Sequence, residues 1–333
     1  MRIEKPVVIV GTGRCGSTML HRLLARHEAL GWLSTFNEVF PTQPWLARYS
    51  DLYRHSSFSR KVKHLPFFPK PFEAYRFWEH YLPGFSRRDQ PLTADDVPPL
   101  GVEPVRQAVE RILEAQDKHR FLVKVTGWSR MAYFDRVFPD AAFVFLNREV
   151  RAVVSSWVQA GWLDVTSELD SDRWQWGEVP EHYRHVWEDL GGGPLLSAAV
   201  KIRLDLDDIR RNMEQLPGRC YTMQYEDLVT SPEEELRALL AFCDLDWTED
   251  FARVVAEHPF YNPADKWRRY LSTEDGDRVL EFFRRTNGES ADGAAQHLAF
   301  GADREASRKA EPRLLLYENA SEEADESRRT SVP

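Results

Sequence analysis

Cysteine is scarce in this chain, with only Cys15, Cys220 and Cys243 among 333 residues. A sparse, odd and widely spaced set of cysteines argues against a disulfide framework and favours a reducing compartment. No apolar run approaches the ~20 residues that a membrane-spanning helix needs, and residues 1–6 carry no apolar signal region. We therefore expect a cytoplasmic protein without a membrane span.

The chain also has no net positive charge. Lysine and arginine together number 44 against 53 aspartates and glutamates, which gives a net charge of −9. This balance does not favour general nucleic-acid binding, although basic residues near single loops can still collect one anionic cofactor. A metal site is not expected either, because His182 and His185 have a spacing that can bind metal but no third ligand is evident.

Apolar runs alternate with helical patterns along most of the chain, which is typical of a parallel α/β sheet. We expect an α/β fold of the three-layer P-loop type, with a central parallel sheet of about five strands flanked by helices. The expected strands are residues 7–10, 30–34, 121–125, 142–146 and 219–224. The expected helices are residues 17–27, 105–117, 150–160, 195–214, 233–242 and 274–285.

Two aromatic-rich segments, residues 41–100 and 161–194, interrupt this alternation. The second contains four tryptophans: Trp162, Trp174, Trp176 and Trp187. Insertions of this kind usually lie over the carboxyl ends of the strands, where α/β sheets bind ligands. We expect both on the acceptor side of a single domain spanning residues 1–300, with aromatics shared between the core and a pocket. The charged, serine-rich residues 301–333 are expected to be disordered.

The run VVIVGTGRCGST at residues 7–18 predicts an anion-binding loop. A buried strand enters Gly11, and an apolar-periodic helix follows Ser17, so backbone amides and the positive helix end would face an anion. Arg14 would add a charged fork. The residues expected to hold the anion are Gly13, Arg14, Cys15, Gly16, Ser17 and Thr18.

The lysine of a nucleotide triphosphatase loop is missing from this motif. The pattern G-x-x-x-x-G-K-[ST] is met at Gly11, Gly16 and Thr18, but Ser17 stands where the lysine belongs. That lysine normally reaches the β/γ-phosphates, so its absence favours a smaller anionic group. Two other functions stay open: a P-loop kinase or NTPase, which predicts magnesium-dependent ATP binding, and a non-catalytic nucleotide-binding protein with the same fold.

A second anion site is predicted in residues 143–157, FVFLNREVRAVVSSW. A buried strand ends at Asn147, Arg148 follows, and a helix begins. If Ser156 lies two turns along that helix, its hydroxyl and the Arg148 guanidinium can meet one phosphate.

Together the two segments resemble the sulfotransferase family that uses 3′-phosphoadenosine 5′-phosphosulfate (PAPS). GTGRCGSTML resembles its 5′-phosphosulfate loop, and NREVRAVVSSW resembles its 3′-phosphate motif, in which Glu149 and Val150 replace the usual Asp-Pro. Residues 220–245 are similar to the family's Y-E-D-L…P segment, and residues 262–267 resemble the late loop whose Lys-Trp closes over the cofactor. The likeness covers about residues 5–285 and is nearest to the tyrosylprotein and carbohydrate branch.

The resemblance implies in-line transfer of a sulfuryl group from PAPS, without a metal, to a hydroxyl or amine. The acceptor would be a small molecule, carbohydrate, lipid or peptide, and the oligomeric state stays open. Arg148 and Ser156 would bind the 3′-phosphate, Lys266 and Trp267 would close the cofactor pocket, and Tyr225 would lie near the nucleotide. Trp267 is also a candidate for stacking on adenine.

The family's catalytic glutamate matches Glu38, which lies 24 residues after Arg14. Glu38 is therefore the predicted general base, with His55 and His64 as alternatives that no spacing supports. Lys124 and Arg14 are predicted to stabilise the departing phosphate as fixed cations.

Overall fold

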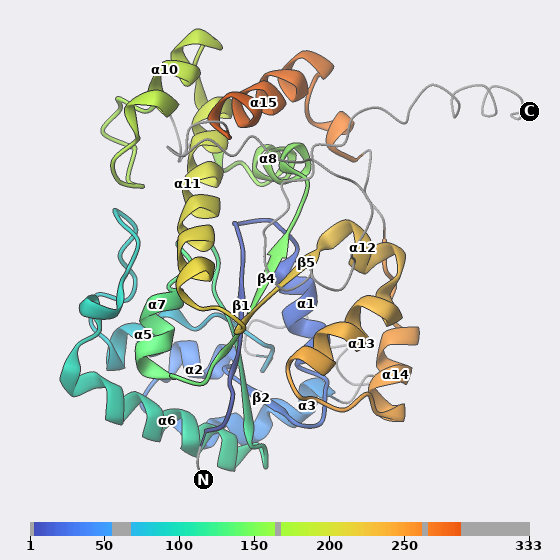
Figure 1. Ribbon diagram of the computed structural model, residues 1–333. Helices are drawn as coiled ribbons and strands as arrows, with labels where there is room; N and C mark the ends of the chain where they lie inside the picture. Colours follow the sequence, from blue (N-terminus) through green and yellow to red (C-terminus); the bar gives the residue numbers. More distant parts are fainter. Residues whose placement is uncertain (1–2, 55–67, 164–167, 262–265, 288–333) are drawn as a thin grey trace, which may run out of the picture.

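The computed structural model describes four stretches of the chain: residues 3–54, 68–163, 168–261 and 266–287 (Figure 1). Within them, five strands form a sheet: β1 (Val7–Val10), β2 (Leu30–Trp32), β3 (Arg120–Lys124), β4 (Ala142–Asn147) and β5 (Cys220–Gln224). All pairings are parallel, in the order β2-β3-β1-β4-β5. The predicted α/β fold is confirmed, and each predicted strand coincides with an observed one to within two residues at either end.

The central strand β1 is the point at which the strand order reverses. β2 and β3 lie on one side of it, and β4 and β5 lie on the other. Val8 of β1 pairs with Val123 of β3 and with Phe143 of β4, and every residue of β1 is buried. Such continuous apolar runs are typical of parallel strands covered on both faces. In sheets of this type, ligands bind outside the carboxyl ends of the strands at the reversal point.

One face of the sheet is covered by helices that follow β1 and β5 (Figure 1). They are α1 (Ser17–Leu24), α12 (Tyr225–Thr230), α13 (Pro232–Phe242) and α14 (Glu249–Ala256). Their apolar side chains form one cluster with Val7 and Ile9 of β1. Helix α13 begins with Pro232 and has three glutamates in its first turn, which suits the positive end of the helix dipole.

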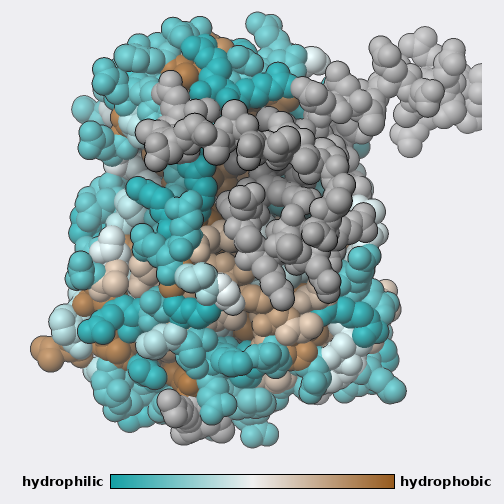
Figure 2. Space-filling view, viewed as in Figure 1, coloured by the Kyte–Doolittle hydropathy of each residue, from teal (hydrophilic) through white to brown (hydrophobic). Residues whose placement is uncertain are grey.

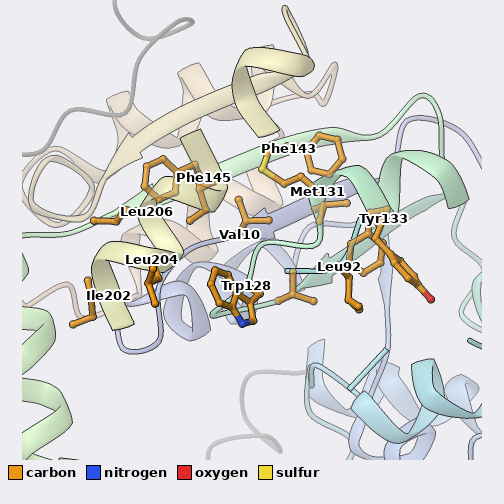
Figure 3. Close-up of a cluster of buried hydrophobic side chains, with 14 of the residues drawn as sticks. Val10, Leu92, Trp128, Met131, Tyr133, Phe143, Phe145, Ile202, Leu204 and Leu206 are labelled. Atoms are coloured by element: carbon orange, nitrogen blue, oxygen red, sulfur yellow. The ribbon is translucent and has the colours of Figure 1, made fainter. Parts of the chain in front are cut away.

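The opposite face carries a larger core and more helices. They are α5 (Tyr75–Tyr81), α6 (Val102–Ala115), α7 (Met131–Val137), α8 (Val150–Gln159), α10 (Glu181–Asp189), α11 (Pro194–Gln215) and α15 (Thr273–Thr286). Figure 3 shows Val10 and Phe145 of the sheet with Leu206 of α11 and Met131 of α7, all in one buried cluster. The long α11 therefore shares this core with β1 and β4, and it contacts α7, α8, α10 and α15.

Shorter elements connect these layers: α2 (Thr35–Val39), α3 (Asp51–Arg54), and the 3₁₀ turns η1 (Pro44–Ser50), η2 (Ala94–Asp96), η3 (Pro99–Gly101) and η4 (Lys266–Arg269). All six predicted helices are confirmed, although the one after β1 ends three residues earlier than expected. Residues 301–333 lie outside the described residues, so the division into one domain and a tail stays a prediction.

Most aromatic side chains of the two interrupting segments that the structure describes belong to the core. Trp78 is fully buried and stacks on Phe85, with ring centroids 5.4 Å apart. Trp187 is also buried, and its indole nitrogen donates a hydrogen bond to the Ser197 hydroxyl of α11. Trp45, Tyr49, Phe72 and Trp162 differ, because at least 40% of each is exposed. The described aromatics are thus divided between the core and the surface, and the expected acceptor pocket stays a prediction.

Figure 2 shows a largely hydrophilic surface on one face, with hydrophobic residues gathered near the middle of the view. Among the described helices, none combines the length and the apolar character needed to cross a membrane. The described residues also hold no group of three or more His, Cys, Asp or Glu side chains placed to bind a metal ion.

Candidate functional site

The loop between β1 and α1 is built around two glycines that tolerate no side chain. A Cβ atom on Gly16 would lie 2.5 Å from two ring carbons of Tyr225, and Gly16 has a φ of +99°. A Cβ atom on Gly11 would lie 2.7 Å from the Cys15 sulfur and 2.9 Å from the Leu146 carbonyl oxygen. The glycines therefore let the loop pass close to the ends of β4 and β5, which are the neighbouring strands.

The loop has the form of an anion cradle. Gly16 is the N-cap of α1, and its carbonyl accepts from the amides of Met19 and Leu20. The first amides of a helix have no intrahelical acceptor, so those of Ser17 and Thr18 are directed out of the helix end. Arg14 has a φ of +72°, a left-handed conformation that costs a non-glycine residue energy and is common at ligand-binding loops.

Cys15, at the centre of this loop, is not an activated thiol. It is almost fully buried, and that burial raises the pKa of its thiol. Hydrogen bonds from Ser17 and the positive charges of Lys124 and Arg148 lower this pKa, but by less than burial raises it. Cys15 is therefore a neutral packing residue, and both cations lie close enough to the loop to act on it electrostatically.

Lys124 stands at the carboxyl end of β3, beside the start of α1. Its ammonium donates to the Thr18 hydroxyl at 3.0 Å and forms an ion pair with the carboxylate of Glu73. The side chain is only 7% exposed. The register that pairs Lys124 with Ile9 explains this position, because the β3 end is then level with the beginning of the loop. The structure thus brings Lys124 to the predicted anion cradle.

A second set of predicted residues meets on the other side of the loop. The Arg14 Nε donates to the Ser156 hydroxyl at 3.0 Å, and the Arg148 Nη1 donates to the Arg14 carbonyl at 3.1 Å. The Arg148 guanidinium lies over the Tyr225 ring, 4.5 Å from its centroid. The structure therefore gathers Arg14, Arg148, Ser156 and Tyr225 into one subsite, with the Arg14 guanidinium on the Ser156 side.

Arg148 also has an unused donor. Its Nε is buried, and among the described residues it has no hydrogen-bond partner. A buried charged donor without a partner is costly and points to a ligand or water that is bound there. The neighbouring helix α8 is capped by Glu149, whose carboxylate accepts from the amides of Arg151 and Ala152. Glu149 thus supplies a carboxylate at the position where the resembling motif has Asp.

Glu38 lies in α2, directly after β2. Its Oε2 accepts from the backbone amide of Arg76 at 2.9 Å, and its Oε1 lies 3.9 Å from the Arg76 Nε. This contact ties α2 to the first turn of α5. Glu38 is thus placed at the same carboxyl edge of the sheet as the loop, but its described polar contacts are with Arg76.

Lys266 and Trp267 form the start of η4, which packs on α8. Lys266 is half-buried, and Trp267 is only 3% exposed. The guanidinium groups of Arg151 and Arg268 lie 4.6 and 4.5 Å from the Trp267 ring centroid, and a Cβ atom on Gly276 of α15 would lie 2.6 Å from the ring. With so little of the indole exposed, the predicted stacking on adenine does not fit this arrangement. Residues 262–265 lie outside the described residues, as do His55 and His64.

Sequence reasoning missed two residues of the site. Glu73, the ion-pair partner of Lys124, lies in the aromatic-rich segment 41–100, where no spacing pointed to it. Trp157 donates from its indole nitrogen to the Gly13 carbonyl at 3.1 Å. Its place next to Ser156 is a signal that could have suggested this contact.

Comparisons with known proteins bear on the family and the fold. A family model described as "Sulfotransferase family" matches residues 6–249. The crystal structure of sulfotransferase STF9 from Mycobacterium avium is 17% identical and has a TM-score of 0.54, with 86% of this chain and 77% of that chain covered. At this identity the likeness shows a shared fold.

Other matches are weaker. Sulfotransferase STF1 from Mycobacterium tuberculosis H37Rv is 16% identical over 86% of this chain and 77% of that chain, with a TM-score of 0.48. Mouse sulfotransferase SULT7A1, solved in complex with PAP, is 9% identical over 86% of both chains, with a TM-score of 0.42. An uncharacterised protein of Aquifex aeolicus (strain VF5) is 31% identical over 83 residues, which span 20% of this chain and only 11% of that protein.

Proposed function

Because this chain belongs to the sulfotransferase family, we propose that it moves a sulfuryl group from PAPS to a hydroxyl or amine of an acceptor. One observation carries the choice of PAPS: two cationic subsites flank the same loop, Lys124 with Thr18 on one side and Arg148 with Ser156 on the other. PAPS has a 5′-phosphosulfate and a separate 3′-phosphate on one adenosine, so it needs two anion subsites.

The residues of the first subsite fit a 5′-phosphosulfate. The amides at the start of α1 and the hydroxyls of Ser17 and Thr18 are donors, and the Lys124 ammonium is 3.0 Å from the Thr18 hydroxyl. An anion that accepts from Thr18 would therefore be within reach of Lys124. The site has no lysine within the loop, so Lys124 is the proposed cation for the leaving phosphate.

The residues of the second subsite fit a 3′-phosphate. The Arg148 Nε is buried without a partner in the described part of the chain, and a phosphate oxygen would satisfy it. The Ser156 hydroxyl and the Arg14 guanidinium lie next to each other and would both face the same group. Arg148 also lies over the Tyr225 ring, which places an aromatic face beside the proposed nucleotide position. Lys266 and Trp267 are proposed to form one side of this subsite, because η4 packs on α8, the helix that carries Ser156.

The residues of the first subsite and Glu38 have different roles in the proposed transfer. When bound, PAPS supplies an activated sulfuryl group on its 5′-phosphate. Lys124, the Thr18 hydroxyl and the helix amides hold charge that develops on the leaving phosphate, and fixed donors do this without reorganising. Glu38 is the proposed proton acceptor for the incoming hydroxyl or amine, because its Oε1 lies too far from the Arg76 Nε for a hydrogen bond and so keeps a lone pair for a proton.

Isotope-labelled PAPS tests the transfer directly. The purified protein is incubated with labelled PAPS and a metabolite extract, and mass spectrometry searches for products that carry the label. We expect at least one sulfated product, and we expect Glu38→Gln to lower its rate by ~10²–10⁴-fold. The affinity of Glu38→Gln for 3′,5′-phosphoadenosine (PAP) should stay within about twofold of wild type, since the polar contacts of Glu38 in the described residues are with Arg76.

Two results would count against this proposal. Tight PAP binding with no labelled product from any extract would favour a non-catalytic binding protein. Equal losses of rate and PAP affinity in Glu38→Gln would remove Glu38 as the base.

A further inference from the structure

Glu73 is held in place by its surroundings on both sides. Before it, the amide of Phe72 donates to the Leu33 carbonyl at 2.9 Å, so the chain runs along the end of β2. After it, the Trp78 indole donates to the Glu73 carbonyl at 3.0 Å. The Glu73 carboxylate reaches Lys124, and the Thr126 hydroxyl donates to it at 3.4 Å. This carboxylate is therefore fixed beside the only cation that we assign to the first subsite.

The position of Glu73 creates a conflict of charge. Lys124 bridges the Thr18 hydroxyl and the Glu73 carboxylate. An anion in the loop would therefore share the Lys124 ammonium with Glu73, and the two negative groups would repel each other across it. The side chains of the pair are only 7% and 20% exposed, so water screens this repulsion weakly. Glu73 must then lower the affinity of the first subsite for its anion.

Glu73 is poorly suited to be the general base itself. Its Oε1 already pairs with the Lys124 ammonium and accepts from the Thr126 hydroxyl. The charge of Glu73 also acts on nearby Tyr75: burial is the main cause that raises the pKa of the Tyr75 hydroxyl, and the charge of Glu73 raises it further. A carboxylate engaged in this way suits a counter-ion.

Resting on the function proposed above, we propose that Glu73 is an exchangeable counter-ion for Lys124. Between turnovers Glu73 binds the ammonium, and it shares that ammonium with the 5′-phosphate when the nucleotide is present. Glu73 acts through Lys124 and is thus a positioning residue. Its effect is to loosen PAP, so that the product leaves a site lined with cations and helix amides.

The test is a double-mutant cycle on PAP affinity measured by calorimetry. Glu73→Gln keeps the shape of the side chain and removes its charge, so we expect the Kd for PAP to fall by ~10-fold. In a Lys124→Met background the same substitution should tighten PAP by a clearly smaller factor, because the direct repulsion between the carboxylate and the phosphate remains but no ammonium is left to share. Glu38→Gln removes the same charge from a carboxylate paired with Arg76 and serves as the matched control, with an expected change below about twofold.

A steady-state readout separates this role from a structural one. Product inhibition by PAP should become stronger in Glu73→Gln, with a lower kcat if release limits turnover. If Glu73→Gln melts without cooperativity, Glu73→Asp keeps the charge but lengthens the ion pair, and it should tighten PAP by a smaller factor, ~3-fold.

Unchanged or weaker PAP binding in the folded Glu73 variants would overturn the counter-ion role. An equal tightening with and without Lys124 would also overturn it. A wild-type protein that binds no PAP is a different failure, because it removes the proposed function along with the inference.

Discussion

The second subsite makes the most specific prediction, which concerns the 3′-phosphate. The Ser156 hydroxyl is 3.0 Å from the Arg14 Nε, so Ser156→Ala removes one partner from a charged cluster. A hydrogen bond to a charged group contributes ~1.5–3 kcal/mol. At 1.4 kcal/mol for each factor of ten, PAP affinity should fall by ~10- to 150-fold.

Arg148→Ala should cost more than Ser156→Ala. It removes the guanidinium whose Nε is buried without a partner in the described residues, and it removes the hydrogen bond to the Arg14 carbonyl. Loss of a charged group that has a buried donor is expected to weaken PAP binding by ~100-fold or more.

The assay compares two nucleotides by calorimetry. AMP has the 5′-phosphate of PAP but lacks the 3′-phosphate, so Ser156→Ala should leave AMP affinity within about twofold of wild type. Thr18→Ala is the matched control in the first subsite and should weaken PAP and AMP together. Equal losses of PAP and AMP affinity in Ser156→Ala would refute the reasoning, because Ser156 would then merely shape the loop through Arg14.

Two further predictions concern the loop and the first helix. Gly16→Ala should lower the free energy of unfolding by ~1–3 kcal/mol, because its Cβ would lie 2.5 Å from the Tyr225 ring at a φ of +99°. Gly13→Ala is the control, because its Cβ would have ordinary contacts from 3.4 Å, and it should lower the free energy of unfolding much less. Urea titrations measure both, and equal losses would contradict this reasoning. Burial, followed by the charges of Lys124 and Arg22, holds the pKa of His21 well below its usual value. Only the unfolded state then takes up this proton below pH ~6.5, so stability should fall on acidification by up to ~1.4 kcal/mol per pH unit. His21→Leu should show a shallower fall between pH 6.5 and 5, and the same slope in both proteins would argue against a neutral, buried imidazole.

The strands could be predicted from the sequence because their signal is local. Each is a short apolar run, and a parallel strand buried on both faces needs little else. The helices that the sequence did not predict are mostly short. Met131–Val137 and Tyr225–Thr230 have seven and six residues, too few for a helical period to stand out. Helix α10 is not much longer, and it lies in a segment dominated by tryptophan and glycine.

The parts of the candidate site that the sequence predicted are those in which one short segment carries both the backbone signal and the polar residues. The glycine loop and the Arg148–Ser156 spacing are such segments, and the structure brings them together. Their contact through Arg14 and Ser156 spans 142 residues and depends on β1 and β4 being neighbours. Glu73 reaches Lys124 because residues 70–72 run beside the end of β2, and no periodicity encodes that path. The position of Trp267 was not predictable either, because the sequence does not distinguish a buried indole from one that is accessible to a nucleotide.

Calorimetry with PAP tests most directly whether both anion subsites serve one nucleotide. The wild-type protein is titrated with PAP in the presence of EDTA, and separately with ATP and magnesium. We predict that PAP binds without metal, more tightly than AMP, and more tightly than magnesium ATP. Binding of magnesium ATP by a protein that ignores PAP would contradict the account and favour a P-loop kinase or NTPase instead.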